Sequence, residues 1–391
     1  MPPSGRKPRV LVFVDYYLPG FRFGGIVTAV SSLIERLGTE FEFFVVTAPR
    51  DAHSPDRYPN ISLDDWNPCG PARVFYTDDD SPRTLRRIYA EIRPDLVYLN
   101  SFWSRWTRRV LLLSRLGMLP RTPLLIAPRG EFSSEALAIK RHKKLPYTAL
   151  SRALSLTRGA HWHATSEHEG EDILRFTGAQ LVDRVLLAPD LAPNAREVNP
   201  ASQKHPGKLR AVAISRIAPM KNFDFLIDCL RSVHGRVELD LYGPIDDAAY
   251  WAQCQKSIAQ LPPNITVRHA GFVERQDVPN TLQQYDVHAL PSRGENFGYS
   301  IVESLSVGIP VLISDRTPWH GLESAHAGWD LPLDRGIWVN RLNQLVAMDA
   351  TEHQHWRKGA QDYYMQHIAT AASAHATTRM FETCMRTSAN S

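Results

Sequence analysis

The sequence is poor in the features that mark several large classes of protein. Its 391 residues contain only four cysteines, none of them in a C-x-x-C pair: Cys69, Cys229, Cys254 and Cys384. Scattered cysteines disfavour a structural zinc site and a disulfide framework, and they are typical of a reducing compartment. No apolar run reaches the roughly 18 residues of a membrane-spanning helix, and no secretory signal precedes the first strand. We therefore expect a cytoplasmic protein.

The sequence also lacks a strong excess of charge of either sign. The formal net charge is +4; residues 1–195 carry 26 Lys and Arg against 21 Asp and Glu, and the remainder carries 19 against 20. This modest charge and the absence of any nucleic-acid-binding module disfavour nucleic acid as a partner. The length exceeds what one core comfortably supports, so two domains are expected.

A basic stretch at residues 138–158 departs from this even charge. From Lys140 to Lys144 every residue is Lys, Arg or His, and an amphipathic segment follows. The stretch fits an anionic membrane surface or the diphosphate of a lipid-linked acceptor. It fits an ordinary solvated helix face as well, and the sequence leaves these alternatives open.

The first half of the chain predicts a doubly wound sheet. Residues 9–17 read as a strand buried on both faces, and a Gly-rich turn and a helix over 26–37 follow. In this turn Gly24 and Gly25 allow the backbone to approach a pyrophosphate, although an ordinary turn explains them equally well. The turn does not match G-x-G-x-x-G, which disfavours a nicotinamide cofactor.

Three further polar residues of the first half are candidates for the acceptor side of a site. Arg129 and Glu131 follow a short buried strand over 124–127, and ligands of open α/β sheets bind outside such strand ends. A buried salt bridge that steadies the loop is the alternative. His163 lies on a strand over 160–166 and shares a strand face with His161, and a structural role is the alternative for it.

The second half begins another βα series after a Pro- and Asn-rich segment that reads as a linker. Arg216 and Lys221 lie between a strand over 209–214 and a helix over 223–233. Two cations at that position, with helix amides behind them, can clamp a diphosphate. Ordinary surface charge is the alternative for either residue alone.

The stretch from Leu290 to Pro310 is predicted to form the centre of the site. It reads as a strand end, a Gly-containing loop and a helix. Amides at the start of this helix favour anions and hydroxyl groups; they belong to Asn296, Phe297, Gly298 and Tyr299. Glu295 and Glu303 are eight residues apart, and carboxylates beside an anion site suit vicinal sugar hydroxyls. A helix cap and a solvated helix residue are the alternatives for this pair.

These motifs resemble the E-x7-E signature and the R-x4-K pair of retaining glycosyltransferases with the GT-B fold, in particular family 4. The resemblance runs from Val10 to about Asp334. It implies an α/β protein of two Rossmann-like doubly wound domains that face each other across a cleft. We then expect an acceptor-side domain at 1–190, a linker at 191–208, a nucleotide-sugar-binding domain at 209–365, and a C-terminal helix at 366–391 that packs back on the first domain.

The resemblance also implies a reaction. A hexose-type sugar would pass from a nucleoside-diphosphate sugar to an acceptor hydroxyl with retention of configuration, without a metal ion or another cofactor. Arg216 and Lys221 would stabilise the leaving diphosphate, Glu295 would bind the transferred sugar, and Glu303 would hold the ribose. The loop amides from Asn296 to Tyr299 would bind the sugar. Further loops that face the donor would contain Gly24, Gly25, Gly243 and Phe272.

One element of the family pattern is absent. Many members carry a His at the end of the strand that here leads into Ser101, Phe102 and Trp103, and no His occupies that place. The segments P-R-G-E and H-A-T-S-E resemble members that assemble bacterial polysaccharides. This implies a glycan or lipid-linked acceptor and a peripheral position on the inner face of the cytoplasmic membrane. A sugar-nucleotide epimerase, a non-catalytic sugar-nucleotide-binding protein and a peripheral-membrane interaction protein are the rival hypotheses.

Overall fold

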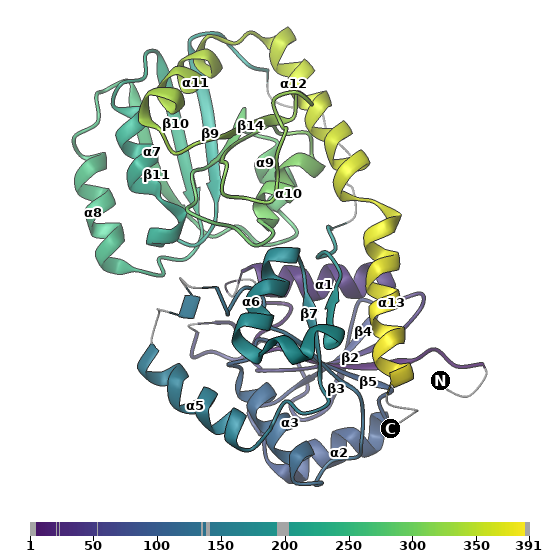
Figure 1. Cartoon of the computed structure of the whole chain (residues 1–391). Coiled ribbons are helices and arrows are strands. Elements are labelled where there is room, and N and C mark those ends of the chain that lie inside the picture. The colour runs from purple at the N-terminus through teal and green to yellow at the C-terminus, as the bar shows by residue number, and fades with distance from the viewer. Residues whose placement is uncertain are drawn as a thin grey trace. The chain divides into compact units, whose positions relative to one another are not determined.

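The structure of the protein is a computed structural model that describes residues 5–20, 22, 24–52, 54–133, 136–137, 141–193 and 203–387. It divides into two compact units (Figure 1). Unit 1 comprises Met1–Leu191 and Ala371–Ser391, and unit 2 comprises Ala192–Thr370. Each unit has its own sheet and its own buried apolar core. Among the described residues, no helix combines the length and the apolar character that spanning a membrane requires.

Unit 1 is built on an eight-stranded sheet in the order β3-β4-β2-β1-β5-β6-β7-β8. All neighbours pair in parallel except β3 and β4. The strands are β1 (Arg9–Phe13), β2 (Glu42–Thr47), β3 (Trp66–Cys69), β4 (Ala72–Tyr76), β5 (Leu96–Asn100), β6 (Leu124–Ala127), β7 (His161–Ala164) and β8 (Val185–Leu187). The apolar runs of β1 and β5 reflect burial on both faces, which parallel sheets covered by helices require.

The helices of unit 1 pack against this sheet. They are α1 (Gly25–Leu37), α2 (Pro82–Ile92), α3 (Arg105–Arg115), α5 (Arg141–Ala153), α6 (Glu167–Thr177) and α13 (Ala371–Thr387), and a 3₁₀ turn spans Ala179–Arg184. Three of them start at a serine whose hydroxyl accepts a backbone N–H of the first turn, as helix N-termini favour: Ser81, Ser104 and Ser166.

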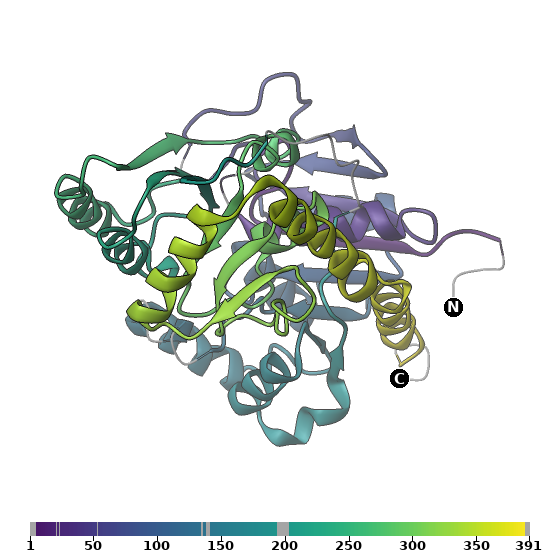
Figure 2. The same ribbon diagram turned by 90° about the horizontal axis from the view of Figure 1, so that it is seen from above.

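Unit 2 contains a six-stranded, all-parallel sheet in the order β11-β10-β9-β12-β13-β14. The strands are β9 (Lys208–Ile214), β10 (Arg236–Tyr242), β11 (Ile265–Gly271), β12 (Val287–Leu290), β13 (Val311–Ser314) and β14 (Gly328–Leu331). The helices are α7 (Phe223–Leu230), α8 (Ala248–Ile258), α9 (Val278–Leu282), α10 (Tyr299–Ser306), α11 (Arg335–Ala347) and α12 (Ala350–Tyr363). Helix α11 contacts α7, and α12 contacts α10; α11 and α12 are the yellow-green helices of Figure 2.

Both sheets follow the strand order of a doubly wound fold, in which the first strand lies beside the fourth strand of the winding. The order reverses between β1 and β5 in unit 1 and between β9 and β12 in unit 2. At such a switch point the loops after the two strands run to opposite faces of the sheet and leave a crevice where ligands bind. Each unit therefore has one position at which its fold favours a ligand.

The end of the chain belongs to unit 1. A π-helical turn over Tyr364–Ile368 follows α12, and α13 then contributes Phe381 to the core of unit 1. The ring of Phe381 lies 5.4 Å from that of Phe41 and 5.5 Å from that of Tyr98. The unit boundaries fall after Leu191 and after Thr370. The sequence placed them at 190 to 208 and at 365, and residues 194–202 and 388–391 lie outside the described part.

Candidate functional site

Two loops meet at the switch point of unit 2. One follows β9 and contains a 3₁₀ turn over Pro219–Lys221; the other follows β12 and leads into α10. The backbone N–H of Arg293 donates to the Met220 carbonyl at 2.8 Å, and the Arg293 guanidinium donates twice to Asn222 Oδ1, at 3.1 and 3.0 Å. These contacts fix the two loops against each other, so side chains from both can act on one ligand.

Lys221 and Glu295 form an ion pair across this switch point. Lys221 Nζ lies 2.5 Å from Glu295 Oε1, and the two side chains are only 15% and 11% exposed. The two residues are 74 positions apart in sequence. The fold thus brings the last residue of the predicted R-x4-K pair into contact with the first residue of the E-x7-E motif. Because both side chains are shielded from water, Lys221 can bind an anionic ligand group and Glu295 can accept hydrogen bonds from ligand hydroxyls.

Helix α10 begins directly after this pair. Gly298 precedes it with φ 75°, a conformation that suits glycine, and no side chain caps the helix. Trp319 Nε1 donates to the Phe297 carbonyl at 2.6 Å, and its ring lies 5.2 Å from that of Phe297. The loop is thus held by an aromatic contact. Glu303 lies within α10 and is half-buried.

The other residues of unit 2 that were predicted to bind the sugar nucleotide lie along the same edge of the sheet. Arg216 follows β9, is half-exposed, and pairs with Asp246 at 2.8 Å. Gly243 follows β10 with φ 134°, and a Cβ there would lie 2.1 Å from the Ser215 carbonyl oxygen, so the close approach of these two loops requires glycine. Phe272 follows β11 and is 45% exposed. The two cations of the predicted clamp pair with different carboxylates, Arg216 with Asp246 and Lys221 with Glu295.

In unit 1 the Gly-rich turn lies at the C-terminal edge of β1, as the sequence predicted. Gly24 precedes α1 with φ 76°, and Gly25 is the first residue of that helix. A Cβ at Gly24 would meet none of the described residues within 4 Å, and the positive φ is what favours glycine here. Phe21 and Phe23 of the same turn lie outside the described residues.

Arg129 adopts the structural role that the sequence left as an alternative. Its side chain is 4% exposed and forms an ion pair with Asp190. It also donates to the Tyr98 hydroxyl at 2.8 Å and to Asn100 Oδ1 at 3.1 Å. A buried guanidinium held by these acceptors steadies the loop after β6.

Glu131 joins the loop after β6 to the loop after β5. Its Oε1 accepts the Ser101 hydroxyl at 2.5 Å, and its Oε2 accepts the Phe102 backbone N–H at 2.6 Å. Burial raises the pKa of this carboxyl to about 7, against the lowering effect of those hydrogen bonds. The Glu131 carboxyl group thus lies beside Ser101 and Phe102, the residues that follow β5.

His163 lies in the core and does not reach the surface. It is 1% exposed, and both ring nitrogens have partners. Nε2 donates to the Ala188 carbonyl at 2.8 Å, so Nδ1 is the acceptor for the Tyr98 hydroxyl at 2.7 Å. Burial lowers the pKa of His163, which favours this neutral form. A direct contact between His163 and an acceptor is therefore not supported.

The family models assign the chain. Residues 24–189 match the glycosyl transferase 4-like domain, and residues 195–323 match the glycosyl transferases group 1 model. The protein is a group 1 glycosyltransferase. The two matches cover unit 1 from its Gly-rich turn and unit 2 through both motifs of the switch point.

Solved structures share the GT-B fold of this glycosyltransferase, as predicted. Anabaena HepE, in complex with UDP and glucose, aligns over 96% of this chain and 100% of its own at 16% identity with a TM-score of 0.65. Sucrose-phosphate synthase from Thermosynechococcus elongatus aligns over 98% and 100% at 16% identity with a TM-score of 0.68. WaaG, a glycosyltransferase of lipopolysaccharide biosynthesis, aligns over 95% and 99% at 13% identity with a TM-score of 0.65.

A curated relative matches a smaller part of the glycosyltransferase. Mannosylfructose-phosphate synthase from Agrobacterium fabrum is 27% identical over 111 residues, which are 26% of this chain and 24% of that protein. The matched segment thus spans about a quarter of the relative. This relative and sucrose-phosphate synthase are distant from the protein, and their similarity to it does not identify a substrate.

Sequence reasoning missed one residue at the switch point of unit 1. Asp15 follows β1, and its Oδ1 accepts the Ser104 hydroxyl from the start of α3 at 2.6 Å. Burial raises the pKa of Asp15, against the lowering effects of Ser104, Arg105 and Arg108. Asp15 is the first polar residue after an apolar run, which could have marked it, although residues 9–17 as a whole were predicted to form the strand.

The described parts of the glycosyltransferase contain no group of three or more His, Cys, Asp or Glu side chains that could hold a metal ion. The three consecutive carboxylates from Asp78 to Asp80 contact protein side chains instead of forming a metal site. Asp78 pairs with Arg50 and Arg57, Asp79 accepts hydrogen bonds from Ser81 and Thr84, and Asp80 pairs with Arg109. These carboxylates are engaged in loop contacts and the start of α2.

Proposed function

We propose that the protein transfers a hexose-type sugar from a nucleoside-diphosphate sugar to an acceptor hydroxyl with retention of configuration. The observation that carries the proposal is the Lys221–Glu295 pair across the switch point of unit 2, beside the start of α10. Negative charge develops on the diphosphate as the glycosidic bond breaks. Lys221 and the half-exposed Arg216 supply the positive charge that stabilises it.

The remaining groups of the site suit the sugar and the ribose. Glu295 accepts hydrogen bonds from hydroxyls of the transferred sugar, the loop amides from Asn296 to Tyr299 complete that contact, and Glu303 holds the ribose hydroxyls. Attack of the acceptor on the face from which the diphosphate leaves gives retention without a nucleophile from the protein. Because Lys221 and Arg216 neutralise the diphosphate, the reaction needs no metal ion.

Known structures of this fold support a nucleotide sugar as the donor. HepE has been solved with UDP-glucose, and the trehalose-6-phosphate enzyme of E. coli with UDP-2-fluoro glucose. These two chains have the fold of the present protein at 16% and 10% identity. A nucleoside-diphosphate hexose is accordingly the first donor class to test.

We propose a growing lipid-linked bacterial surface glycan as the acceptor, reached from the inner face of the cytoplasmic membrane. Two apolar side chains, Leu150 and Leu154, are 52% and 43% exposed at the end of α5, with the exposed Arg152 between them. Such an apolar and basic surface suits anionic headgroups. Residues 138–140 and the side chains of 141–143, which include most of the predicted basic run, lie outside the described part.

The proposal is tested by nucleotide release from UDP-, GDP- and ADP-hexoses, alone, with a membrane lipid extract, or with a hexose phosphate. Release that requires the extract and is lost in Lys221→Met supports the proposal. Lys208→Met is the matched control, since Lys208 pairs with Glu238 at 3.1 Å at the opposite end of β9. Release that requires only the hexose phosphate favours a synthase like the two sugar-phosphate relatives. Donor conversion without an acceptor favours an epimerase, and binding without turnover favours a sensor.

A further inference from the structure

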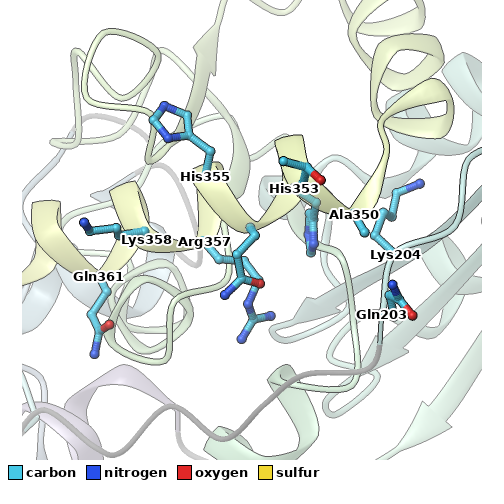
Figure 3. Close-up of a pocket in the computed structure, with 10 residues that line it drawn as sticks. Gln203, Lys204, Ala350, His353, His355, Arg357, Lys358 and Gln361 are labelled. Carbon is cyan, nitrogen blue, oxygen red and sulfur yellow. The ribbon is translucent and has the colours of Figure 1, made fainter.

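A hollow of about 850 Å³ runs along α12 in unit 2 (Figure 3). The charged groups around it do not converge. His355 and Arg357 extend from different sides of the helix in this view, and the terminal nitrogens of the Arg357 guanidinium are buried. Lys204 is buried as well and donates to three backbone carbonyls. The described residues of the hollow therefore do not form a charged binding site, and a better candidate lies in unit 1.

The switch point of unit 1 is a second position at which the fold favours a ligand, beside the proposed donor site at the switch point of unit 2. Asp15 lies there, two residues after the end of β1 and before the Gly-rich turn that contains Gly24. On the other side of the switch point, the loop after β5 leads through Ser104 into α3. A transferase binds two substrates, and this position suits the second.

One oxygen of the Asp15 carboxylate is fixed, and the other is not. The hydroxyl of the buried Ser104 donates to Asp15 Oδ1 at 2.6 Å and accepts the Trp106 backbone N–H at 3.1 Å, so the carboxyl group is oriented. Among the described residues, none donates a hydrogen bond to Asp15 Oδ2 and none forms an ion pair with it. Asp15 is partly exposed, and Oδ2 retains contact with solvent. A ligand can therefore use this second oxygen.

The cations near Asp15 do not use it as a structural partner. The guanidinium of Arg105, the first residue of α3, donates to two backbone carbonyls at 3.2 Å each. Arg108 is exposed, and its guanidinium carbon lies 5.9 Å from the centre of the Tyr147 ring. Both arginines act to lower the pKa of Asp15, but burial outweighs them and raises it. A carboxylate that has lost part of its hydration without gaining an ion pair needs a hydrogen-bond donor, and a ligand hydroxyl is one.

We propose that Asp15 binds the acceptor through one of the acceptor's hydroxyl groups, and that Ser104 positions the carboxylate for this contact. The inference rests on the proposed function, because only a transferase needs an acceptor. A carboxylate forms a charge-assisted hydrogen bond with a hydroxyl and repels the diphosphate of the donor. The acceptor then has at least two hydroxyls close together, one that attacks and one that Asp15 holds. A sugar residue provides such a pair.

The chemistry assigns Asp15 a binding role and no proton transfer. In the proposed reaction the bond between C1 of the sugar and the diphosphate oxygen breaks, and a bond forms between C1 and the attacking oxygen. The proton of the attacking hydroxyl passes to the leaving diphosphate. Asp15 holds a neighbouring hydroxyl, so its replacement should weaken acceptor binding more than it slows the chemical step.

The test compares Asp15→Asn with the wild type in nucleotide release, at increasing concentrations of the membrane lipid extract or the hexose phosphate, whichever supports release. Asparagine keeps an Oδ1 that accepts the Ser104 hydroxyl, but its NH₂ group replaces the free acceptor oxygen. We expect kcat/KM for the acceptor to fall by roughly 10- to 100-fold, mostly through KM, with kcat within about threefold of the wild type. The dissociation constant of the nucleotide sugar, measured by calorimetry, should be unchanged.

Asp183→Asn is the matched control. It removes an exposed carboxylate from the 3₁₀ turn that precedes β8, at the opposite edge of the sheet, and should keep the wild-type kcat/KM. An unchanged kcat/KM in Asp15→Asn, or a fall in kcat alone, would overturn the inference. Weaker donor binding, or a melting temperature lower by more than about 5 °C, would also overturn it, because Asp15 would then act on the donor or on the fold.

The same assay separates this inference from the proposed function. Release that is lost in Lys221→Met but unaffected in Asp15→Asn would leave the proposed function standing and overturn the inference alone. A wild type that releases no nucleotide with any acceptor would overturn the proposed function and, with it, the role of Asp15.

Discussion

The ion pair between Lys221 and Glu295 predicts that stability and activity respond differently when one or both residues are replaced. In Lys221→Met, the Glu295 carboxylate remains 11% exposed but loses its cation; in Glu295→Gln, the lysine loses its carboxylate. The double variant Lys221→Met/Glu295→Gln contains neither charge. It should therefore be more stable than the sum of the single effects predicts, while activity remains lost in all three.

The magnitudes follow from the geometry. At 2.5 Å and an effective dielectric constant of about 20, the gross attraction is about 6–7 kcal/mol. Desolvation of two ions that are mostly buried cancels much of it. Leaving one charge unpaired should cost about 2–4 kcal/mol, and the coupling energy of the pair should be about 1–3 kcal/mol. Loss of one cation at the leaving group should lower kcat by about 10²- to 10³-fold.

Urea denaturation of the four proteins gives the coupling energy, and nucleotide release gives the activity. Lys208→Met is the control, because the Lys208–Glu238 pair lies in the same sheet but is more exposed, at 36% and 21%. It should cost less than about 1 kcal/mol and leave kcat unchanged. Additive stability effects at Lys221 and Glu295 would show that the two charges are not coupled, and a kcat of Lys221→Met within about threefold of the wild type would show that this lysine does not stabilise the leaving group.

Four further outcomes are expected. The pKa of Glu131 is raised from 4.5 to about 7 in the folded protein. The protonated carboxyl group therefore stabilises the fold below about pH 4.5, and this contribution is lost as the pH rises through about 7. Between these pH values, urea denaturation should show the wild type losing about 1–3 kcal/mol of unfolding free energy relative to Glu131→Gln. Phe381→Ala should cost about 3–5 kcal/mol and expose α13 to hydrogen exchange; unchanged protection would contradict its packing role. Gly243→Ala should weaken nucleotide binding in calorimetry and cost about 1–3 kcal/mol, because its Cβ would collide with Ser215. Dialysis against EDTA should leave transfer unchanged, and recovery only on adding a divalent ion would disprove metal independence.

The strands and their ends could be predicted from the sequence, because parallel strands buried on both faces read as short apolar runs. Residues that follow such runs, Arg216 and Lys221 among them, could therefore be placed at one edge of a sheet. The contact between Lys221 and Glu295 could not, since it depends on β9 and β12 being neighbours. That pairing is set by the order of strands in the whole sheet, which local patterns do not encode.

Burial was harder to predict than position. His161, Trp162 and His163 alternate along β7, which indicated two faces, yet both faces of this strand are buried and all three residues lie in the core. Arg129 was placed correctly at a strand end, but its partner Asp190 is 61 residues away. Arg357 lies in an ordinary helical pattern without a motif, and only the fold shows that it is 4% exposed.

The proposed transfer of a sugar with retention of configuration at the Lys221–Glu295 site can be tested on a single reaction product. The most direct measurement is proton NMR of the glycoside formed from an α-linked nucleoside-diphosphate hexose by the wild type, with Lys221→Met and Glu295→Gln in parallel. We expect an α-linked product that forms with the wild type and is nearly absent with both variants. A β-linked product would contradict the proposed mechanism, and an α-linked product formed equally well by the variants would contradict the assignment of the site.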